Sequence, residues 1–144
     1  MTDKKEREIL YIGLKMVNGS KEELISRIED FLEVNKDARV YCDHVTLEFK
    51  PAEDSEILKW VKENEGRTIK VLAEKYGIDI NECGEVCAFG ILFDEDVPCR
   101  NEIPHVTLTC TGNRKPVESN NIKEKEWKEI IPFELDTEVC IWYK

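Results

Sequence analysis

Both histidines of the chain lie in two copies of one tetrapeptide, His44-Val45-Thr46-Leu47 and His105-Val106-Thr107-Leu108. Each copy places a hydroxyl side chain two residues after an imidazole. The β-branched residues Val and Thr favour strands, and alternate residues of a strand face the same side. We therefore expect His44 and Thr46 to share one face of a strand and His105 and Thr107 to share one face of another. The two pairs should border a common cleft.

Two imidazoles across a cleft are suited to general acid–base catalysis, because one ring can be neutral near pH 7 while the other is protonated. The threonine hydroxyls can donate hydrogen bonds to an anionic oxygen. Together these groups favour phosphoryl chemistry without a metal. One histidine takes a proton from the attacking oxygen, and the other gives one to the leaving oxygen. Either copy alone is typical of an ordinary strand, so it is the repetition that indicates a site.

Length and charge limit the other classes of function. The 144 residues fit one domain spanning 1–144. A net charge of −10 argues against an extended nucleic-acid surface, but it allows a small nucleotide or one RNA end in a local pocket. Residues 1–8 are charged and lack the apolar centre of a signal peptide, and no apolar run is long enough to span a membrane. We expect an intracellular monomer that does not bind membranes.

The six cysteines are expected to be reduced thiols, because nothing in the sequence indicates secretion. Cys83 and Cys87 have the spacing CxxxC rather than CxxC. A zinc site formed by these two with a histidine is the weaker alternative. The expectation is therefore a protein with no metal and no cofactor.

Hydrophobic periodicity and turn signals predict an α+β chain of strands interspersed with helices. Ser20 with Glu23 has the signature of a capping box at a helix start, and the last two strands are expected to form a closing hairpin. Residues 68–79 fit either a strand or a helix. The other strands are expected at 8–17, 40–49, 85–93, 105–110, 130–135 and 138–143, and the helices at 20–35, 54–64 and 119–126.

The paired tetrads resemble the signature of the 2H phosphoesterase superfamily, two H-x-T/S-x motifs on strands separated by tens of residues. Asn101-Glu102-Ile103-Pro104 and the loop from Lys115 to Asn120 resemble the cyclic phosphodiesterase domain of fungal-type tRNA ligases and related RNA-repair proteins. Nothing resembles the ligase or kinase modules. The resemblance implies a bilobal fold, with two pseudo-symmetric β-α-β lobes and antiparallel sheets around a central cleft. It also favours a strand at 68–79.

The resemblance further implies hydrolysis of 2′,3′-cyclic phosphates on RNA ends or nucleotides, giving 2′-phosphates. His44 and His105 would be the acid–base pair, and Thr46 and Thr107 would bind the phosphate. We favour His105 as the base and His44 as the acid, and the reverse order stays open. Other substrates for the same chemistry are ADP-ribose cyclic phosphate, a 2′,5′-linked oligonucleotide or an RNA 3′ tail. The alternative to an enzyme is a binding module that recognises a nucleotide or RNA end without cleaving it.

Some further residues are weaker candidates for substrate contacts. A tyrosine on the first strand can stack on a base, although core burial is its more common role. Arg114 and Lys115, after the second tetrad, can contact a phosphate, although most loop charges are merely solvated. Ser119 can instead cap a helix. Trp142 either borders the cleft or packs elsewhere. The candidates for substrate binding are Tyr11, Arg114, Lys115 and Ser119.

Overall fold

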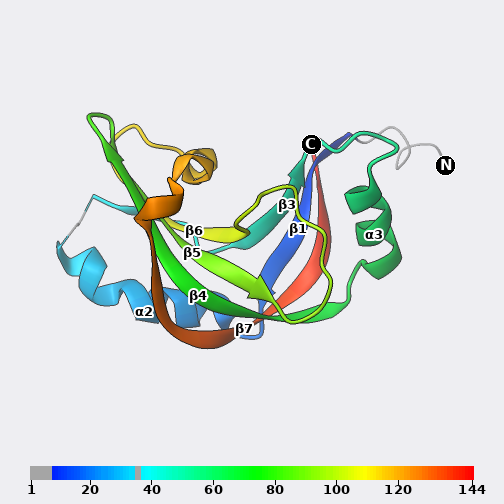
Figure 1. Ribbon diagram of the computed structural model, residues 1–144, viewed down its shortest axis with the longest axis horizontal. Helices are drawn as coiled ribbons and strands as arrows, with labels where there is room; N and C mark the ends of the chain where they lie inside the picture. The colour runs from blue at the N-terminus through cyan, green and yellow to red at the C-terminus, as the bar shows by residue number, and fades with distance from the viewer. Residues whose placement is uncertain (1–7, 35–36) are drawn as a thin grey trace.

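A computed structural model describes residues 8–34 and 37–144, with the side chains of 30–34 left out of the description. Figure 1 shows that these residues are rich in strands, and within them there are two α-helices and two short 3-10 helices. In chain order the elements are β1 (Ile9–Val17), α2 (Ser20–Val34), β2 (Arg39–Val40), β3 (His44–Phe49), α3 (Glu56–Asn64), β4 (Thr68–Asn81), β5 (Gly84–Phe93), β6 (His105–Cys110), η1 (Pro116–Asn121), η2 (Glu124–Glu126) and β7 (Trp127–Tyr143).

The strands of the described residues belong to one antiparallel sheet in the order β2-β6-β3-β1-β7-β4-β5. An additional pairing of β5 with β6 closes six of the strands into a barrel-like ring, to which β2 is attached. The α+β class and the antiparallel pairing predicted from the sequence are confirmed at this level. The strand expected at 68–79 is β4.

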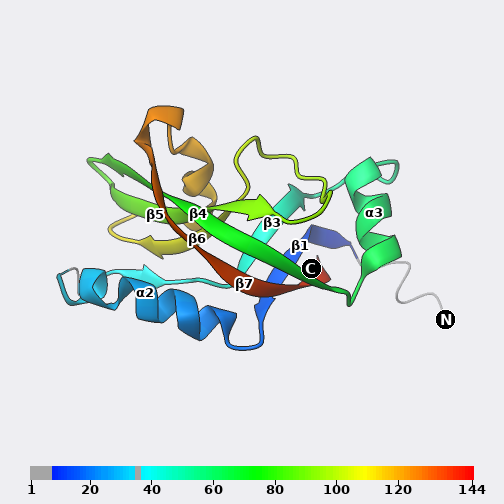
Figure 2. The same cartoon turned by 60° about the horizontal axis from the view of Figure 1, so that its bottom comes forward.

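Both α-helices lie outside the ring of strands, at different places along it (Figures 1 and 2). Helix α2 contacts β1 and β7, and α3 contacts β1, β3 and β7. Leu24 and Ile28 of α2 and Leu58 and Val61 of α3 are buried in one continuous apolar cluster with alternate residues of the strands. The apolar residues that recur at helical spacing in α2 and α3 thus face inward wherever the structure describes their side chains. Phe31 and Leu32 lie outside that part.

The strand predicted at 40–49 is broken in two. Cys42 has φ +56°, which is outside the strand region, and residues 41–43 separate β2 from β3. Both pieces still lie along the same edge of β6, because Arg39 pairs with Cys110 and Val45 with Val106. The backbone N–H groups of Tyr41 and Cys42 donate to carbonyls of β6 within the break. The consequence is that β3 begins at His44.

The predicted closing hairpin is wrong. Residues 127–143 form a single long strand, β7, which pairs with β4 over its first part and with β1 over its last part. The polar pair Asp136-Thr137 resembles a turn in sequence but is bonded to distant residues. The Asp136 N–H donates to the Ser20 hydroxyl at 2.7 Å, and the Thr137 hydroxyl donates to the Ile69 carbonyl at 2.8 Å.

Two predicted details of the helices also differ. The Ser20 hydroxyl accepts its hydrogen bond from Asp136 on β7, and the Glu23 carboxylate pairs with Arg27, so the predicted capping box is replaced by other contacts. The helix predicted at 119–126 appears as two 3-10 segments, η1 and η2. Pro116 stands at the start of η1, where its missing N–H costs no hydrogen bond.

Candidate active site

The two His-Thr pairs lie side by side on neighbouring antiparallel strands. Val45 of β3 pairs with Val106 of β6, and both valines are fully buried. The residues on either side of each valine face the opposite way, so both histidines and both threonines emerge on one side of the sheet. Because the strands run in opposite directions, His44 lies toward Thr107 and Thr46 toward His105.

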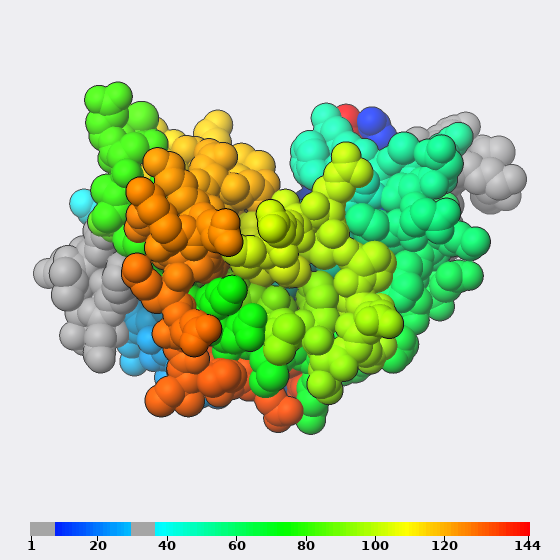
Figure 3. Space-filling view, viewed as in Figure 1, coloured from blue at the N-terminus to red at the C-terminus, as the bar shows by residue number. Residues whose placement is uncertain are grey.

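These four side chains line a cleft of about 910 Å³ between η1 and the end of β3. Figure 3 shows its side of the molecule as a notch between yellow-to-orange atoms and cyan atoms. The cleft lining is mixed in chemistry: it combines aromatic, cationic, carboxylate and amide side chains. Besides the His-Thr pairs it includes Tyr11, Tyr41, Asp43, Glu48, Phe49, Lys50, Arg100, Asn101, Val117, Ser119 and Asn120.

His105 is oriented by the backbone just before it. Its Nδ1 lies 3.0 Å from the Ile103 carbonyl oxygen, which can only accept a hydrogen bond, so Nδ1 carries a proton. In the neutral ring the lone pair is then on Nε2. Burial lowers the pKa of His105 from its ordinary value of 6.5, opposed by the hydrogen bonds to Ile103 and to the Asn120 side chain. A buried neutral imidazole with its lone pair on Nε2 is suited to be a general base.

His44 belongs to a stack of three rings. Its imidazole lies 4.9 Å from the Tyr11 ring centroid at 21°, and Tyr11 in turn lies 4.7 Å from Trp142 at 23°. Burial lowers the pKa of His44 from 6.5, Asp43 opposes that change, and the nearby His105 adds to it. Tyr11, a weaker candidate from the sequence, borders the cleft, and its contact with a substrate stays a prediction. The sequence left open Trp142, which is 5.2 Å from the His44 ring.

The threonine of the second motif is bonded to η1. Thr107 Oγ1 and Ser119 Oγ are 2.9 Å apart, and the Ser119 hydroxyl lies 2.8 Å from the Pro116 carbonyl oxygen. Ser119 is 2% exposed. The Ser119 hydroxyl joins η1 to the second motif. Ser119 also lines the cleft, which is compatible with the substrate contact predicted from the sequence.

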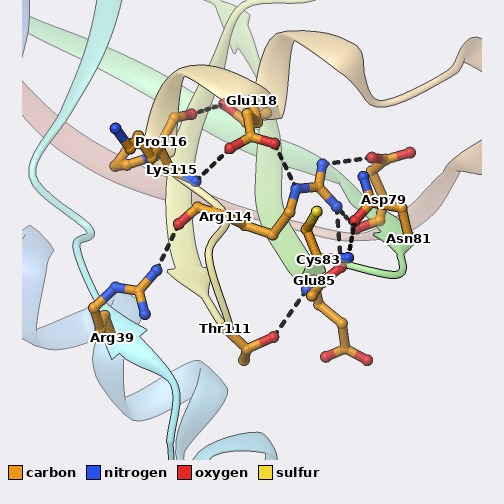
Figure 4. Close-up of polar contacts among 12 residues, drawn as sticks. Arg39, Asp79, Asn81, Cys83, Glu85, Thr111, Arg114, Lys115, Pro116 and Glu118 are labelled. Carbon is orange, nitrogen blue, oxygen red and sulfur yellow. Dashed lines mark hydrogen bonds and ion pairs between the residues drawn. The ribbon is translucent and has the colours of Figure 1, made fainter.

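Arg114 is not in the cleft lining. Its side chain is 1% exposed and forms ion pairs with Asp79 at 2.5 Å and Glu118 at 2.7 Å. It also donates to the carbonyls of Asp79 and Gly84. Figure 4 shows this guanidinium joining the turn between β4 and β5 to η1. The expected substrate contact by Arg114 is thus replaced by a role in holding the loop, which the sequence could not indicate because Asp79 is distant along the chain.

Lys115 and Asn120 complete the loop after the second motif. Lys115 is exposed and outside the cleft lining, and its backbone N–H donates to Glu118 at 2.7 Å. Asn120 lines the cleft and bonds His105. The sequence analysis did not name Asn120 as a site residue, and its position within the loop that resembles the RNA-repair domains was the available signal.

The thiols and possible metal ligands are dispersed. All six cysteines are free, as predicted. Across residues 8–34 and 37–144, no group of three or more His, Cys, Asp and Glu side chains is arranged to hold a metal ion. Within the same residues, no helix is long and apolar enough to cross a membrane.

Comparisons with known proteins add no assignment. No protein-family model matches the chain, and no curated protein is significantly similar to it.

Proposed function

We propose that this protein is a metal-independent phosphodiesterase of the 2H type that hydrolyses 2′,3′-cyclic phosphates on RNA ends or nucleotides. The observation that carries the proposal is the Val45–Val106 pairing, which brings both His-Thr pairs to one cleft. A bilobal 2H fold is part of the proposal. An antiparallel strand pair has a local two-fold axis, and such an axis through the two valines relates His44 to His105 and Thr46 to Thr107.

In the proposed reaction, His105 is the base and His44 the acid. The Nε2 lone pair of His105 takes a proton from water as the water oxygen attacks phosphorus. The bond from phosphorus to the 3′ oxygen breaks, and His44 gives that oxygen a proton. The product is a 2′-phosphate. The Asp43 carboxylate opposes the lowering of the His44 pKa by burial, and two hydrogen bonds do the same for His105, so the assignment of acid and base rests on the family resemblance.

The two threonine hydroxyls are proposed to bind the non-bridging oxygens. They can donate to oxygens on which charge increases as water attacks, and preorganised donors of this kind stabilise a transition state. The Ser119 hydroxyl donates to the Pro116 carbonyl, so the Thr107 proton is directed to Ser119 or Pro116 in the structure and would turn toward a bound phosphate oxygen. Lys50 and Arg100 also line the cleft, so an anionic substrate meets cations there despite the net negative charge of the chain.

The test is turnover of the four 2′,3′-cyclic nucleotides, and of a short RNA ending in a cyclic phosphate, in the presence of EDTA. We expect hydrolysis, with phosphorus NMR showing a 2′-phosphate. His44→Ala and His105→Ala should each lower kcat by about 10²–10⁴-fold, the usual contribution of a general acid or base. Cys83→Ser, at an exposed thiol outside the cleft, is the control and should keep wild-type turnover.

Other outcomes separate the remaining alternatives. Full activity in either histidine variant would contradict the mechanism. Cleavage of ADP-ribose cyclic phosphate, a 2′,5′-linked oligonucleotide or an RNA 3′ tail, with no cleavage of the cyclic nucleotides, would keep the chemistry and change the substrate. A ligand-dependent rise in Tm without turnover of any of these would indicate a binding module.

A further inference from the structure

The catalytic cleft adjoins a second cavity beside His105. This cavity has a volume of about 550 Å³ and shares Asn101, His105, Ser119 and Asn120 with the cleft lining. Its own lining adds Lys75, Glu102, Ile103, Ile122, Glu124 and Trp127. A group bound there would contact the same histidine as a group bound in the main cleft.

A glycine lies in the sheet between two residues that line this cavity, Lys75 and His105. Gly90 of β5 pairs with Lys75 of β4 on one side and with His105 of β6 on the other. A Cβ atom at position 90 would lie 3.1 Å from Lys75 Cβ, 3.4 Å from the Trp127 ring and 3.5 Å from Ile103 Cγ2. Lys75, Trp127 and Ile103 therefore pack closely over Gly90, which lies between Lys75 and His105 in the sheet.

The Trp127 ring packs against the same part of the sheet. It pairs with Gly77 of β4, and a Cβ atom there would come within 2.6 Å of its ring. The ring thus lies flat over glycine backbone and close to Gly90. Its centroid is 6.2 Å from that of His105, with 44° between the planes. Trp127 is partly exposed, so one part of the indole is available to a ligand.

The charged groups around Trp127 suit a nucleoside attached to a phosphate. An indole is a stacking surface for any base. The carboxylates of Glu102 and Glu124 can accept hydrogen bonds from ribose hydroxyls or base amino groups, and Lys75 can meet the phosphate that joins two nucleosides. Two carboxylates against one lysine disfavour a free phosphate in this cavity.

We propose that the second cavity is a subsite for the nucleotide preceding the one that carries the cyclic phosphate. This inference rests on the proposed function and makes it more specific: the substrate is an RNA end of at least two nucleotides. The terminal nucleotide lies in the main cleft with its cyclic phosphate between the two histidines. The base before it stacks on Trp127.

The test compares adenosine 2′,3′-cyclic phosphate with the dinucleotide ApA ending in the same cyclic phosphate. We expect kcat/KM to be about tenfold or more higher for the dinucleotide, the effect of one base–aromatic stack. Trp127→Leu should bring the ratio of the two kcat/KM values close to one. Lys75→Met should lower this ratio as well. Trp60→Leu, at a tryptophan on α3 outside both cavities, is the matched control and should leave the ratio unchanged.

Gly90→Ala is a second test of the subsite, because it adds a methyl group beside Trp127 instead of removing the indole ring. The added methyl group would lie against Lys75 Cβ and the Trp127 ring, so that these two side chains must shift, and the ratio should fall as it does for Trp127→Leu. Circular dichroism spectra and Tm values identify any variant that fails to fold.

The results for the two proposals are separable. Turnover of both substrates with equal kcat/KM in the wild type would overturn the subsite and leave the proposed function intact. Absence of turnover would overturn the proposed function, and the subsite is then tested by binding. Equal Kd values for the two compounds by titration calorimetry, or an unchanged dinucleotide Kd in Trp127→Leu, would overturn the subsite as well.

Discussion

The phenol ring of Tyr11 is stacked on the imidazole of His44, with their centroids 4.9 Å apart and 21° between their planes. Trp142 covers the same tyrosine at 4.7 Å. Strand pairing fixes this arrangement, because β1 lies between β3 and β7 and pairs with both. The stack thus holds one histidine in a fixed orientation and contributes to the burial that lowers its pKa.

We predict that Tyr11→Leu lowers kcat by about 2–10-fold, because an aromatic pair contributes about 0.5–1.5 kcal/mol beyond its buried area. The pKa of His44 should rise toward 6.5 as water reaches the ring. Tyr11→Phe keeps the ring and should change neither value. NMR titration is simple here because the chain has two histidines, and the His105→Ala spectrum assigns them. A His44 pKa unaffected by Tyr11→Leu would contradict the role of the stack.

Both histidines should make the fold less stable in mild acid. Their pKa values are lowered from 6.5 in the folded protein. Between those values and 6.5 the unfolded chain binds more protons than the folded one. The free energy of unfolding therefore falls as the pH drops through this window, and it recovers fully above 6.5. We expect a lower urea midpoint at about pH 5.5 than at about pH 7.5.

A variant without titrating rings tests this pH effect. His44→Gln/His105→Gln should show a smaller change in urea midpoint between the two pH values than the wild type does. An equal change in the double variant would assign the acid sensitivity to other groups. The comparison uses differences within each protein, so any loss of stability from the substitutions themselves cancels.

Arg114 should contribute strongly to stability. Arg114→Met leaves the carboxylates of Asp79 and Glu118 without their buried partner. Breaking a buried pair costs about 3–5 kcal/mol, and because both carboxylates are partly exposed we expect about 2–3 kcal/mol in urea unfolding. Arg67→Met, which breaks an exposed pair with Glu95, is the matched control and should cost less than about 1 kcal/mol. Equal losses in the two variants would contradict a special role for Arg114.

The sequence predicted the strands that carry the site because their patterns are local. A β-branched tetrad with alternating polarity identifies a strand, and its repetition identifies a pair of related sites. What the sequence could not predict depends on partners far along the chain. Thr137 resembles a turn residue in the sequence, but in the structure its hydroxyl donates a hydrogen bond to the carbonyl of Ile69.

The same limit explains two residues that sequence reasoning misjudged or missed. Arg114 looks like a solvated loop cation, and only the position of Asp79 makes it a buried one. Trp127 has no recognisable pattern around it. Its place beside His105 depends on Gly77 and Gly90, two small residues on other strands. Neither relationship can be inferred from spacing, because pairing between distant strands creates both.

The hydrogen bond between Thr107 and Ser119 should be measurable as a coupling between two variants. Thr107→Val removes a proposed phosphate donor and should raise the Kd for a 2′-nucleotide product about 10-fold or more, as for hydrogen bonds to charged groups. Ser119→Ala leaves that donor but frees its orientation, so we expect a smaller loss of about 2–10-fold. Since Ser119 acts through Thr107, adding Ser119→Ala to Thr107→Val should cause almost no further loss. Combined with Thr46→Val, on the other motif, its effect should multiply fully. Equal coupling of Ser119 to both threonines would mean that η1 supports the cleft as a whole, and the specific role of this hydroxyl in orienting Thr107 would then be wrong.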